Sequence, residues 1–269
     1  MAATQEGQRI MAEWDSTQYL KFEKERSRAA IDLANRIELE APKRVLDLGC
    51  GPGNSTGVLA ERFPGAHILG VDNSANMIEA ARRDYPALEF RLFDATGGFA
   101  ELGGGYDVVF SNACIQWVPD HPRLLRSMME QLAPGGVLAV QIPNNFDAPV
   151  HRIIRELVAE PEWKPLFPAP RILYSLPPDD YFDLLAGLSP EFHLWETVYF
   201  QRMPSHQALL EWYRGTGLRP YLAALSGATK EAFEAEILRR IAERYPVRKN
   251  GEIIFHFPRL FFTAVRIEN

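Results

Sequence analysis

The chain has 269 residues, of which 46% are hydrophobic and 24% charged, a balance typical of a globular protein with one enlarged domain or a core and a cap. Its formal net charge of −6 argues against a broad nucleic-acid-binding surface, and no apolar run approaches the roughly 18–20 residues that span a bilayer. The polar N-terminus lacks the layout of a secretion signal, and the two cysteines, Cys50 and Cys114, imply no disulfide framework. We therefore expect a cytoplasmic protein.

Helix and strand patterns divide the chain into four parts. Residues 1–40 include apolar side chains at helical spacing over 16–39, which predicts an amphipathic N-terminal helix. Strands and helices then alternate over 41–143, which predicts a parallel sheet covered on both faces. After Pro143 come two helical regions and two late strand candidates. We predict a doubly wound, mostly parallel seven-stranded α/β sheet, with a helical cap at 144–190 and 204–252 and late strands at 191–203 and 253–269.

The turn after the first predicted strand is the most constrained part of the sequence. Glycines stand at alternate positions, Gly49, Gly51 and Gly53, and a helical segment follows at once. Such glycines let the backbone approach a ligand closely, and the helix beyond offers free N–H groups. The next strand ends in Asp72, about 20 residues downstream, where a carboxylate can bind both hydroxyls of a ribose. The pattern predicts a nucleoside-cofactor site, although a tight turn and a helix cap are the structural alternatives.

The spacing of this turn argues against a dinucleotide. A G-x-G-x-x-G fingerprint counted from Gly49 needs its third glycine at position 54, which is Asn54. Asp47 at the strand end would repel a pyrophosphate and suits a cofactor that carries a cation. The chain also lacks a Tyr-x-x-x-Lys pair after the core strands, which further disfavours a nicotinamide oxidoreductase.

Four segments in order resemble the motifs of the class I S-adenosylmethionine-dependent methyltransferases: 45–53, 67–72, 89–95 and 132–140. The resemblance implies a Rossmann-like methyltransferase fold, with S-adenosyl-L-methionine as cofactor and S-adenosyl-L-homocysteine as product. It also implies that Asp47 lies near the methionine ammonium, that Asp72 binds the ribose, and that Asp94 lies at the adenine amino group. No metal site is predicted.

The same resemblance implies a set of cofactor-binding residues. Tyr19, Phe22 and Arg26 would belong to a helical lid. Asn112, Ala113, Gln116 and Trp117 would follow the fourth strand, with Gln116 and Trp117 near the transferred methyl group. The implied cofactor-binding residues are Tyr19, Phe22, Arg26, Asp47, Gly49, Cys50, Gly51, Asn54, Ser55, Asp72, Asn73, Met77, Asp94, Ala95, Asn112, Ala113 and Trp117.

The acceptor has to be inferred from the cap. No Cys-His or Ser-His-Asp arrangement stands at a plausible spacing, so alignment of the two reactants is the expected source of catalysis. The cap segments carry arginines and aromatic residues, and arginine forks bind carboxylates in a bidentate way. Within this framework the chain resembles the family of trans-aconitate 2-methyltransferases over residues 13–267. The matching segments are 19–28, 47–56, 112–121, 203–208, 216–220 and 257–261.

This second resemblance implies methyl esterification of a carboxylate of trans-aconitate or a similar small polycarboxylate. The candidate substrate-binding residues are Tyr174, Tyr199, His206, Arg219 and Arg259. Two alternatives stay open: a carboxyl methyltransferase acting on a malonyl group held by a carrier protein, and a cofactor-binding module without turnover. The expected partner is a small molecule, with no nucleic acid and no membrane. The sequence leaves open which carboxylate reacts and whether the protein is a monomer or a homodimer.

Overall fold

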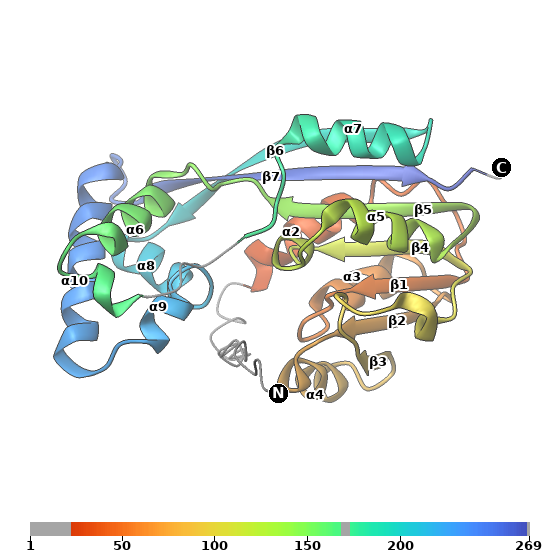
Figure 1. The fold of residues 1–269 in the computed structure, drawn as a ribbon, viewed down its shortest axis with the longest axis horizontal. Helices are drawn as coiled ribbons and strands as arrows, with labels where there is room; N and C mark the ends of the chain where they lie inside the picture. Colours follow the sequence, from red (N-terminus) through yellow and green to blue (C-terminus); the bar gives the residue numbers. More distant parts are fainter. Residues whose placement is uncertain (1–22, 168–172, 268–269) are drawn as a thin grey trace, which may run out of the picture.

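The protein is described here by a computed structural model that covers residues 23–167 and 173–267, with side chains from Ser27 onward. One seven-stranded sheet runs through it in the order β3-β2-β1-β4-β5-β7-β6 (Figure 1). Strand β7 is antiparallel to both of its neighbours, and the other pairs within the sheet are parallel. The predicted doubly wound, mostly parallel sheet is confirmed. The strands are β1 (Arg44–Leu48), β2 (His67–Asp72), β3 (Glu89–Leu92), β4 (Tyr106–Asn112), β5 (Leu132–Pro143), β6 (Phe192–Met203) and β7 (Ile253–Val265).

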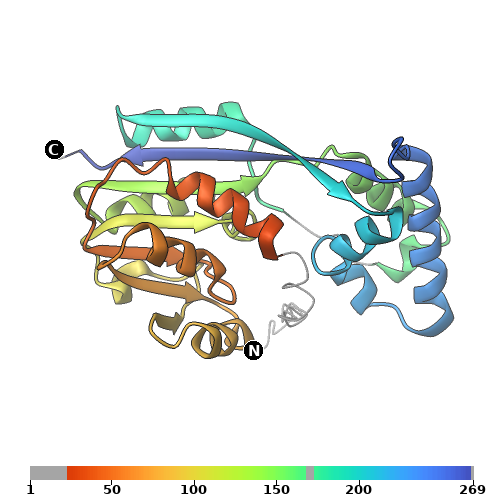
Figure 2. The ribbon, with the colours of Figure 1, turned by 180° about the vertical axis from the view of Figure 1, so that it is seen from behind.

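Helices cover both faces of this sheet, which explains why the central strands are apolar on both sides. Val45 and Val108 face one layer, while their neighbours Leu46 and Val109 face the other. The first layer holds α2 (Glu23–Ala34), α3 (Asn54–Arg62) and α4 (Ala75–Asp84) (Figure 2). The second layer holds the short η1 (Phe99–Leu102), α5 (His121–Glu130) and α7 (Pro178–Leu188). We call the first layer the α2 face.

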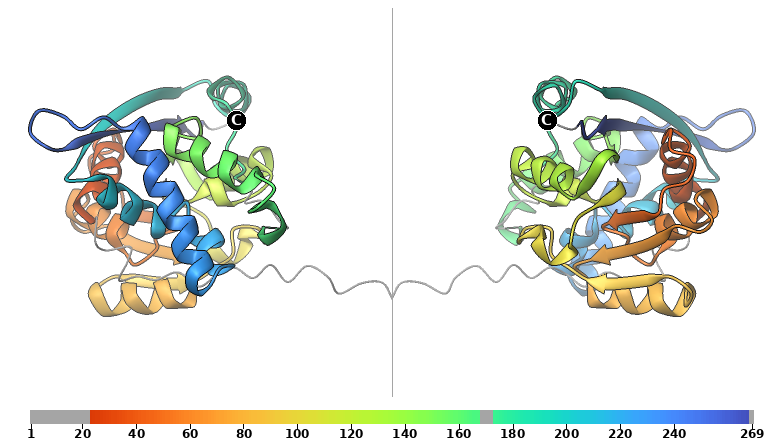
Figure 3. Two further views of the ribbon diagram at one scale, coloured as in Figure 1. Left: turned by 90° about the vertical axis from the view of Figure 1, so that its left-hand side faces the viewer. Right: turned by 90° about the vertical axis from the view of Figure 1, so that its right-hand side faces the viewer.

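Strands β6 and β7 are longer than the sheet that they complete. The last residue of β5, Pro143, pairs with Arg259, so residues 253–258 of β7 pair with β6 alone. Because β5 runs parallel to β1 and β4, this two-stranded ribbon projects beyond the carboxyl ends of the central strands. The cap packs around its far end (Figures 1 and 3). The cap helices are α6 (Pro149–Ala159), α8 (His206–Arg214), α9 (Arg219–Ala223) and α10 (Gly227–Arg244).

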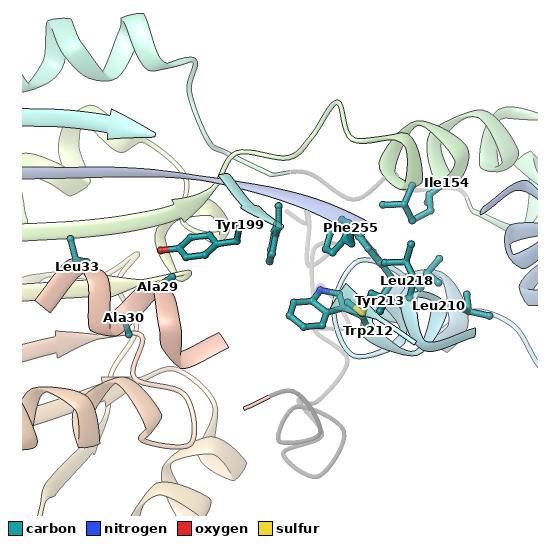
Figure 4. Close-up of a cluster of buried hydrophobic side chains, with 14 of the residues drawn as sticks. Ala29, Ala30, Leu33, Ile154, Tyr199, Leu210, Trp212, Tyr213, Leu218 and Phe255 are labelled. Carbon is teal, nitrogen blue, oxygen red and sulfur yellow. The ribbon is translucent and has the colours of Figure 1, made fainter. Parts of the chain in front are cut away.

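One hydrophobic cluster joins the cap to the α2 face. Figure 4 shows Phe255 among cap side chains such as Trp212 and Tyr213, and Tyr199 extending toward Leu33 of α2. The Tyr199 hydroxyl donates a hydrogen bond of 2.5 Å to the Asp32 carboxylate of α2. The cap is therefore packed continuously with the core rather than carried on a loose linker.

The prediction that residues 144–190 all belong to the cap differs from the structure. Helix α7 packs against α5 and the second face of the sheet, far from the cap helices (Figure 1). Its apolar residues at i and i+4, Tyr181 and Leu185, are fully buried, and the Tyr181 ring lies 5.4 Å from that of Phe262. The Tyr181 hydroxyl also donates to His121 Nδ1 at 2.6 Å, which joins α7 to α5. Helix α7 is thus part of the sheet layers.

The predicted helical lid lies mostly outside the described residues. Tyr19 and Phe22 fall outside them, and Arg26 belongs to α2 but its side chain is not described. Within the described ranges, no helix has the length and apolar character that crossing a membrane requires.

Candidate active site

The glycine turn between β1 and α3 has the backbone conformation that its sequence predicts. Gly49, Gly51 and Gly53 adopt φ values of 78°, 55° and 94°, in the left-handed region that glycine alone enters freely. A Cβ on Gly49 would lie 2.1 Å from Cys114 Sγ, so the turn packs directly on the loop that follows β4. At Gly51 a Cβ would meet no atom of the described residues within 4 Å. The turn is therefore closed on the β4 side and open at Gly51, where a ligand can approach its backbone.

Asp47, near the end of β1, is a buried carboxylate with one oxygen satisfied and one not. Its Oδ2 accepts hydrogen bonds of 2.7 Å from both Ser55 Oγ and Thr56 Oγ1, at the start of α3. Its Oδ1 has no partner among the described residues. Burial raises the pKa of Asp47 to about 6; the two hydroxyls oppose this shift, and the negative charge of Asp72 adds to it. A cationic ligand group near Oδ1 would satisfy this carboxylate.

Asp72 links the glycine turn to the next strand. Its Oδ2 accepts from the Gly51 backbone N–H at 3.0 Å and its Oδ1 from that of Ser74 at 2.9 Å. Burial raises the pKa of Asp72, and these backbone donors oppose the shift. The carboxylate thus joins the glycine turn to the start of α4, and the ribose contact of Asp72 stays a prediction.

The other residues predicted to bind the nucleoside follow the carboxyl ends of β2 and β3. Asn73 is exposed directly after β2, and Met77 is buried in α4. Asp94 is exposed beyond β3, where its Oδ1 accepts from the backbone N–H and the hydroxyl of Thr96, both at 2.9 Å. Ala95 is half-buried beside it. These local hydrogen bonds account for Oδ1 of Asp94, and the contact of Asp94 with adenine remains a prediction.

The loop after β4 holds a strained residue. Ala113 has φ = 55°, where a residue with a Cβ is disfavoured. Its N–H donates to the Gln141 carbonyl at 2.8 Å, and its carbonyl accepts from Gln116 Nε2 at 2.7 Å. Gln116 is buried with its Oε1 unpartnered among the described residues, and Trp117 is half-buried next to it. The predicted methyl-proximal residues therefore form one rigid loop beside the glycine turn.

Substituting Ala113→Gly should separate strain from activity. Glycine relieves the positive-φ penalty of roughly 1–2 kcal/mol but adds disorder to the unfolded chain, so we expect unfolding free energy to rise by about 0.5 kcal/mol. The looser loop should lower kcat several-fold. Ala60→Gly, inside helix α3, is the control, and it should instead destabilise by about 1 kcal/mol. Chemical denaturation and steady-state kinetics measure both effects; a loss of stability in Ala113→Gly would contradict the strain argument.

Arg259 marks the point where the ribbon leaves the sheet. Only 5% of it is exposed, and its Nη1 donates to Gln141 Oε1 at 3.2 Å. Its Cζ lies 3.9 Å from the centroid of the Phe257 ring, a cation–π geometry that fixes the guanidinium plane. The predicted substrate arginine is thus buried at the carboxyl edge of the sheet, beside the end of β5.

The other predicted substrate residues are not equally close to this edge. The Tyr174 N–H donates to the Gln116 carbonyl at 2.9 Å, which brings Tyr174 to the β4 loop. Tyr199 lies on the α2 face with its hydroxyl bound to Asp32; burial raises the pKa of Tyr199, and the nearby charge of Arg259 opposes this shift. Arg219 is half-buried at the start of α9. These three stay candidates.

His206 does not belong with Arg259. It follows the far end of β6, where Met203 pairs with Ile253, about 20 Å along the ribbon from Arg259 at roughly 3.3 Å per residue. Its Nε2 bonds the Tyr245 carbonyl at 2.7 Å, which joins α8 to the end of α10. His206 therefore contributes to the packing of the cap, and its contact with the substrate stays a prediction.

Unpartnered buried polar atoms gather at one edge of the sheet. Asp47 Oδ1, Asn112 Oδ1, Gln116 Oε1 and Gln141 Nε2 have no hydrogen-bond partner among the described residues. They lie at the carboxyl ends of β1, β4 and β5 or in the loop beyond, where ligands bind in open α/β sheets. Buried polar groups are normally paired, so this concentration indicates a ligand site.

Two residues of this site do not follow from the sequence argument. Thr56 shares the Asp47 oxygen with Ser55, and the Ser-Thr pair at the start of α3 was its signal. Gln141 is a single amide in an otherwise apolar strand, and that isolation was the signal for it.

Known proteins match the chain over nearly its whole length. A family model described as a methyltransferase domain matches residues 22–219. The trans-aconitate 2-methyltransferase of Azoarcus sp. (strain BH72) is 45% identical over 257 residues, which is 95% of this chain and 100% of that protein. That of Rhodopseudomonas palustris (strain BisB18) is 43% identical over 258 residues, which is 95% of this chain and 100% of that protein.

Solved structures agree at the level of fold. The YcgJ protein from Bacillus subtilis superposes with a TM-score of 0.59 at 14% identity and covers 90% of this chain and 100% of its own. A Haemonchus contortus phosphoethanolamine N-methyltransferase, solved with S-adenosylhomocysteine, superposes with a TM-score of 0.52 at 19% identity and covers 90% of this chain and 53% of its own.

The sheet order, the glycine turn with its two strand-end acids and the family match define an S-adenosylmethionine-dependent methyltransferase with the Rossmann-like fold. Within that class, the chain belongs to the family of trans-aconitate 2-methyltransferases.

Proposed function

We propose that the protein transfers a methyl group from S-adenosylmethionine to a carboxylate of trans-aconitate, or of a similar small polycarboxylate, to form a methyl ester. The observation that carries this proposal is the distribution of charge at the carboxyl edge of the sheet. Asp47 and Asp72 make the glycine turn acidic, whereas the guanidinium of Arg259 lies buried beside β5. The acidic side suits a cationic methyl donor and the arginine suits an anionic acceptor, so the two halves fit two different reactants.

The residues around the turn fit this cofactor. Asp47 Oδ1, which has no partner among the described residues, would accept from the methionine ammonium, and Asp72 would accept from ribose hydroxyls. The open backbone at Gly51 leaves room for close approach. When bound, S-adenosylmethionine supplies a methyl group activated on a positively charged sulfur.

The chain itself contributes alignment and charge. A carboxylate acceptor is already an anion at neutral pH, so no general base is needed. Holding the acceptor in line with the methyl carbon can supply about 7–11 kcal/mol of the barrier reduction. Arg259 neutralises a carboxylate that does not react, and burial of the site keeps water from competing for the same donors. We also propose that this reaction takes place in the cytoplasm.

The test is an assay for S-adenosylhomocysteine release with purified protein. Trans-aconitate, cis-aconitate, citrate and isocitrate are compared at equal concentration, with a malonyl-loaded carrier protein as a further acceptor. We expect turnover to be highest with trans-aconitate and to yield a methyl ester by mass spectrometry. Turnover on the carrier alone would favour the carrier-protein alternative, and S-adenosylmethionine binding without turnover on any acceptor would favour a non-catalytic module.

A further inference from the structure

Gln141 is the one amide of β5 that faces the proposed site. It is fully buried on the α2 face, with Asn112 as its register partner on β4 and Arg259 close by on β7. Because a guanidinium can only donate, the atom that Arg259 contacts at 3.2 Å must be the Gln141 carbonyl oxygen, Oε1. The amide is thereby held with its Nε2 turned away from the arginine. Nε2 has no hydrogen-bond partner among the described residues.

This Nε2 differs in kind from the other unpartnered atoms of the site. Asp47 Oδ1, Asn112 Oδ1 and Gln116 Oε1 are acceptors, and the Gln116 amide is also fixed, because its Nε2 donates to the Ala113 carbonyl. Acceptors suit the ammonium and hydroxyl groups of the cofactor. Gln141 Nε2 offers two N–H donors, which suit an anion. A buried amide nitrogen beside a buried arginine is a pair of donor groups matched to one carboxylate.

We propose, on the basis of the function proposed above, that Gln141 binds a non-reacting carboxylate of the acceptor through Nε2 and so determines acceptor specificity together with Arg259. The carboxylate is a non-reacting one because hydrogen bonds and a guanidinium stabilise its charge, and that would make a carboxylate a poorer nucleophile. Arg259 therefore has two roles at this point: it supplies charge and it orients the Gln141 amide.

Two near-isosteric substitutions test this assignment. Gln141→Met removes the donors and should raise the KM for trans-aconitate by about 10–100-fold, the range of a hydrogen bond to a charged group. Gln141→Glu replaces the donors by a carboxylate that repels the acceptor and pairs with Arg259, and should raise KM further. The dissociation constant for S-adenosylmethionine, measured by calorimetry, should change by less than about two-fold in either variant, because the cofactor meets other residues.

Gln131 provides the matched control. It is also a buried glutamine, but it lies at the end of α5, where its Oε1 accepts from the Gly104 N–H at 3.1 Å. Gln131→Met should leave the KM for trans-aconitate unchanged, even where thermal unfolding shows some loss of stability. A wild-type KM in Gln141→Met and Gln141→Glu, or equal losses of cofactor and acceptor binding, would overturn the assignment. A wild-type protein inactive on trans-aconitate would overturn the proposed function together with it.

Discussion

Asp47→Asn should make the ligand-free protein more stable at neutral pH and at the same time weaken S-adenosylmethionine binding by at least about 10-fold. The pKa of Asp47 is raised from 3.8 to about 6 chiefly by burial, so keeping it ionised at pH 7 costs the folded state about 3 kcal/mol. Asparagine removes that cost and still offers an oxygen to Ser55 and Thr56. Its amide nitrogen then replaces Oδ1, and an N–H group there faces the ammonium that the carboxylate would attract.

The raised pKa of Asp47 predicts how the stability of the wild-type protein changes with pH. The folded pKa lies above the unfolded one, so the folded state binds the proton more tightly and the wild-type protein gains this stability as pH falls from about 6 toward about 4. The cost is present in full above pH 6. Cofactor affinity should change in the opposite direction. Because an ammonium binds the ionised carboxylate more strongly, the affinity for S-adenosylmethionine should fall as pH drops below about 6. Asp47→Asn should show neither change.

Thermal unfolding and calorimetric titration with S-adenosylmethionine at pH 5 and pH 8 measure both quantities. Asp120→Asn is the control, because Asp120 is an exposed helix cap and asparagine caps equally well. It should match the wild-type protein in both measurements. An Asp47→Asn variant that is less stable yet binds the cofactor normally would show that the carboxylate serves the turn and not the ligand.

The sequence predicts the order of the core elements but not the surface against which every helix packs. The order of strands and helices over 41–143 follows from local signals: the glycine turn, apolar runs of strand length and an acid at the end of each of three strands. The position of α7 did not follow. An apolar stripe at Tyr181 and Leu185 predicts a helix with one buried face, but it does not tell which surface that face will meet. Here the surface is the sheet, through Phe262, and not the cap.

The site also combines residues that local sequence predicts with residues that only the strand register brings together. Asp47, the glycines and Asp72 lie within one local unit, so their spacing was informative. The contact between Gln141 and Arg259 joins residues 118 positions apart and depends on the register of β5 against β7. His206 is a substrate candidate only through the resemblance of its motif to the family, and the length of β6 places it beyond the far end of the ribbon. Motifs identify residues, but strand register decides which of them meet.

Arg259→Met should reduce kcat/KM for trans-aconitate by at least about 100-fold while leaving cofactor binding within about three-fold. Removing one charge from a desolvated, hydrogen-bonded pair typically costs 2–5 kcal/mol. Arg259 is 5% exposed and stacks on Phe257, so methionine can fill its place against the ring without restoring either the charge or the donors. Arg259→Lys keeps the charge but loses the planar fork, and we expect an intermediate loss. Steady-state kinetics with trans-aconitate and calorimetry with S-adenosylmethionine provide the two readouts.

Arg202 separates this effect from the general effect of losing an arginine from the ribbon. It lies on β6 near the far end, exposed, and pairs with Glu252 at 2.8 Å. Because an exposed ion pair contributes little, Arg202→Met should keep kcat/KM within about two-fold of the wild-type value. A similar loss in Arg202→Met would mean that the ribbon tolerates no such change and that Arg259 has no special contact with the acceptor. Normal acceptor kinetics in Arg259→Met would place the acceptor carboxylates elsewhere, with half-buried Arg219 the next guanidinium to test.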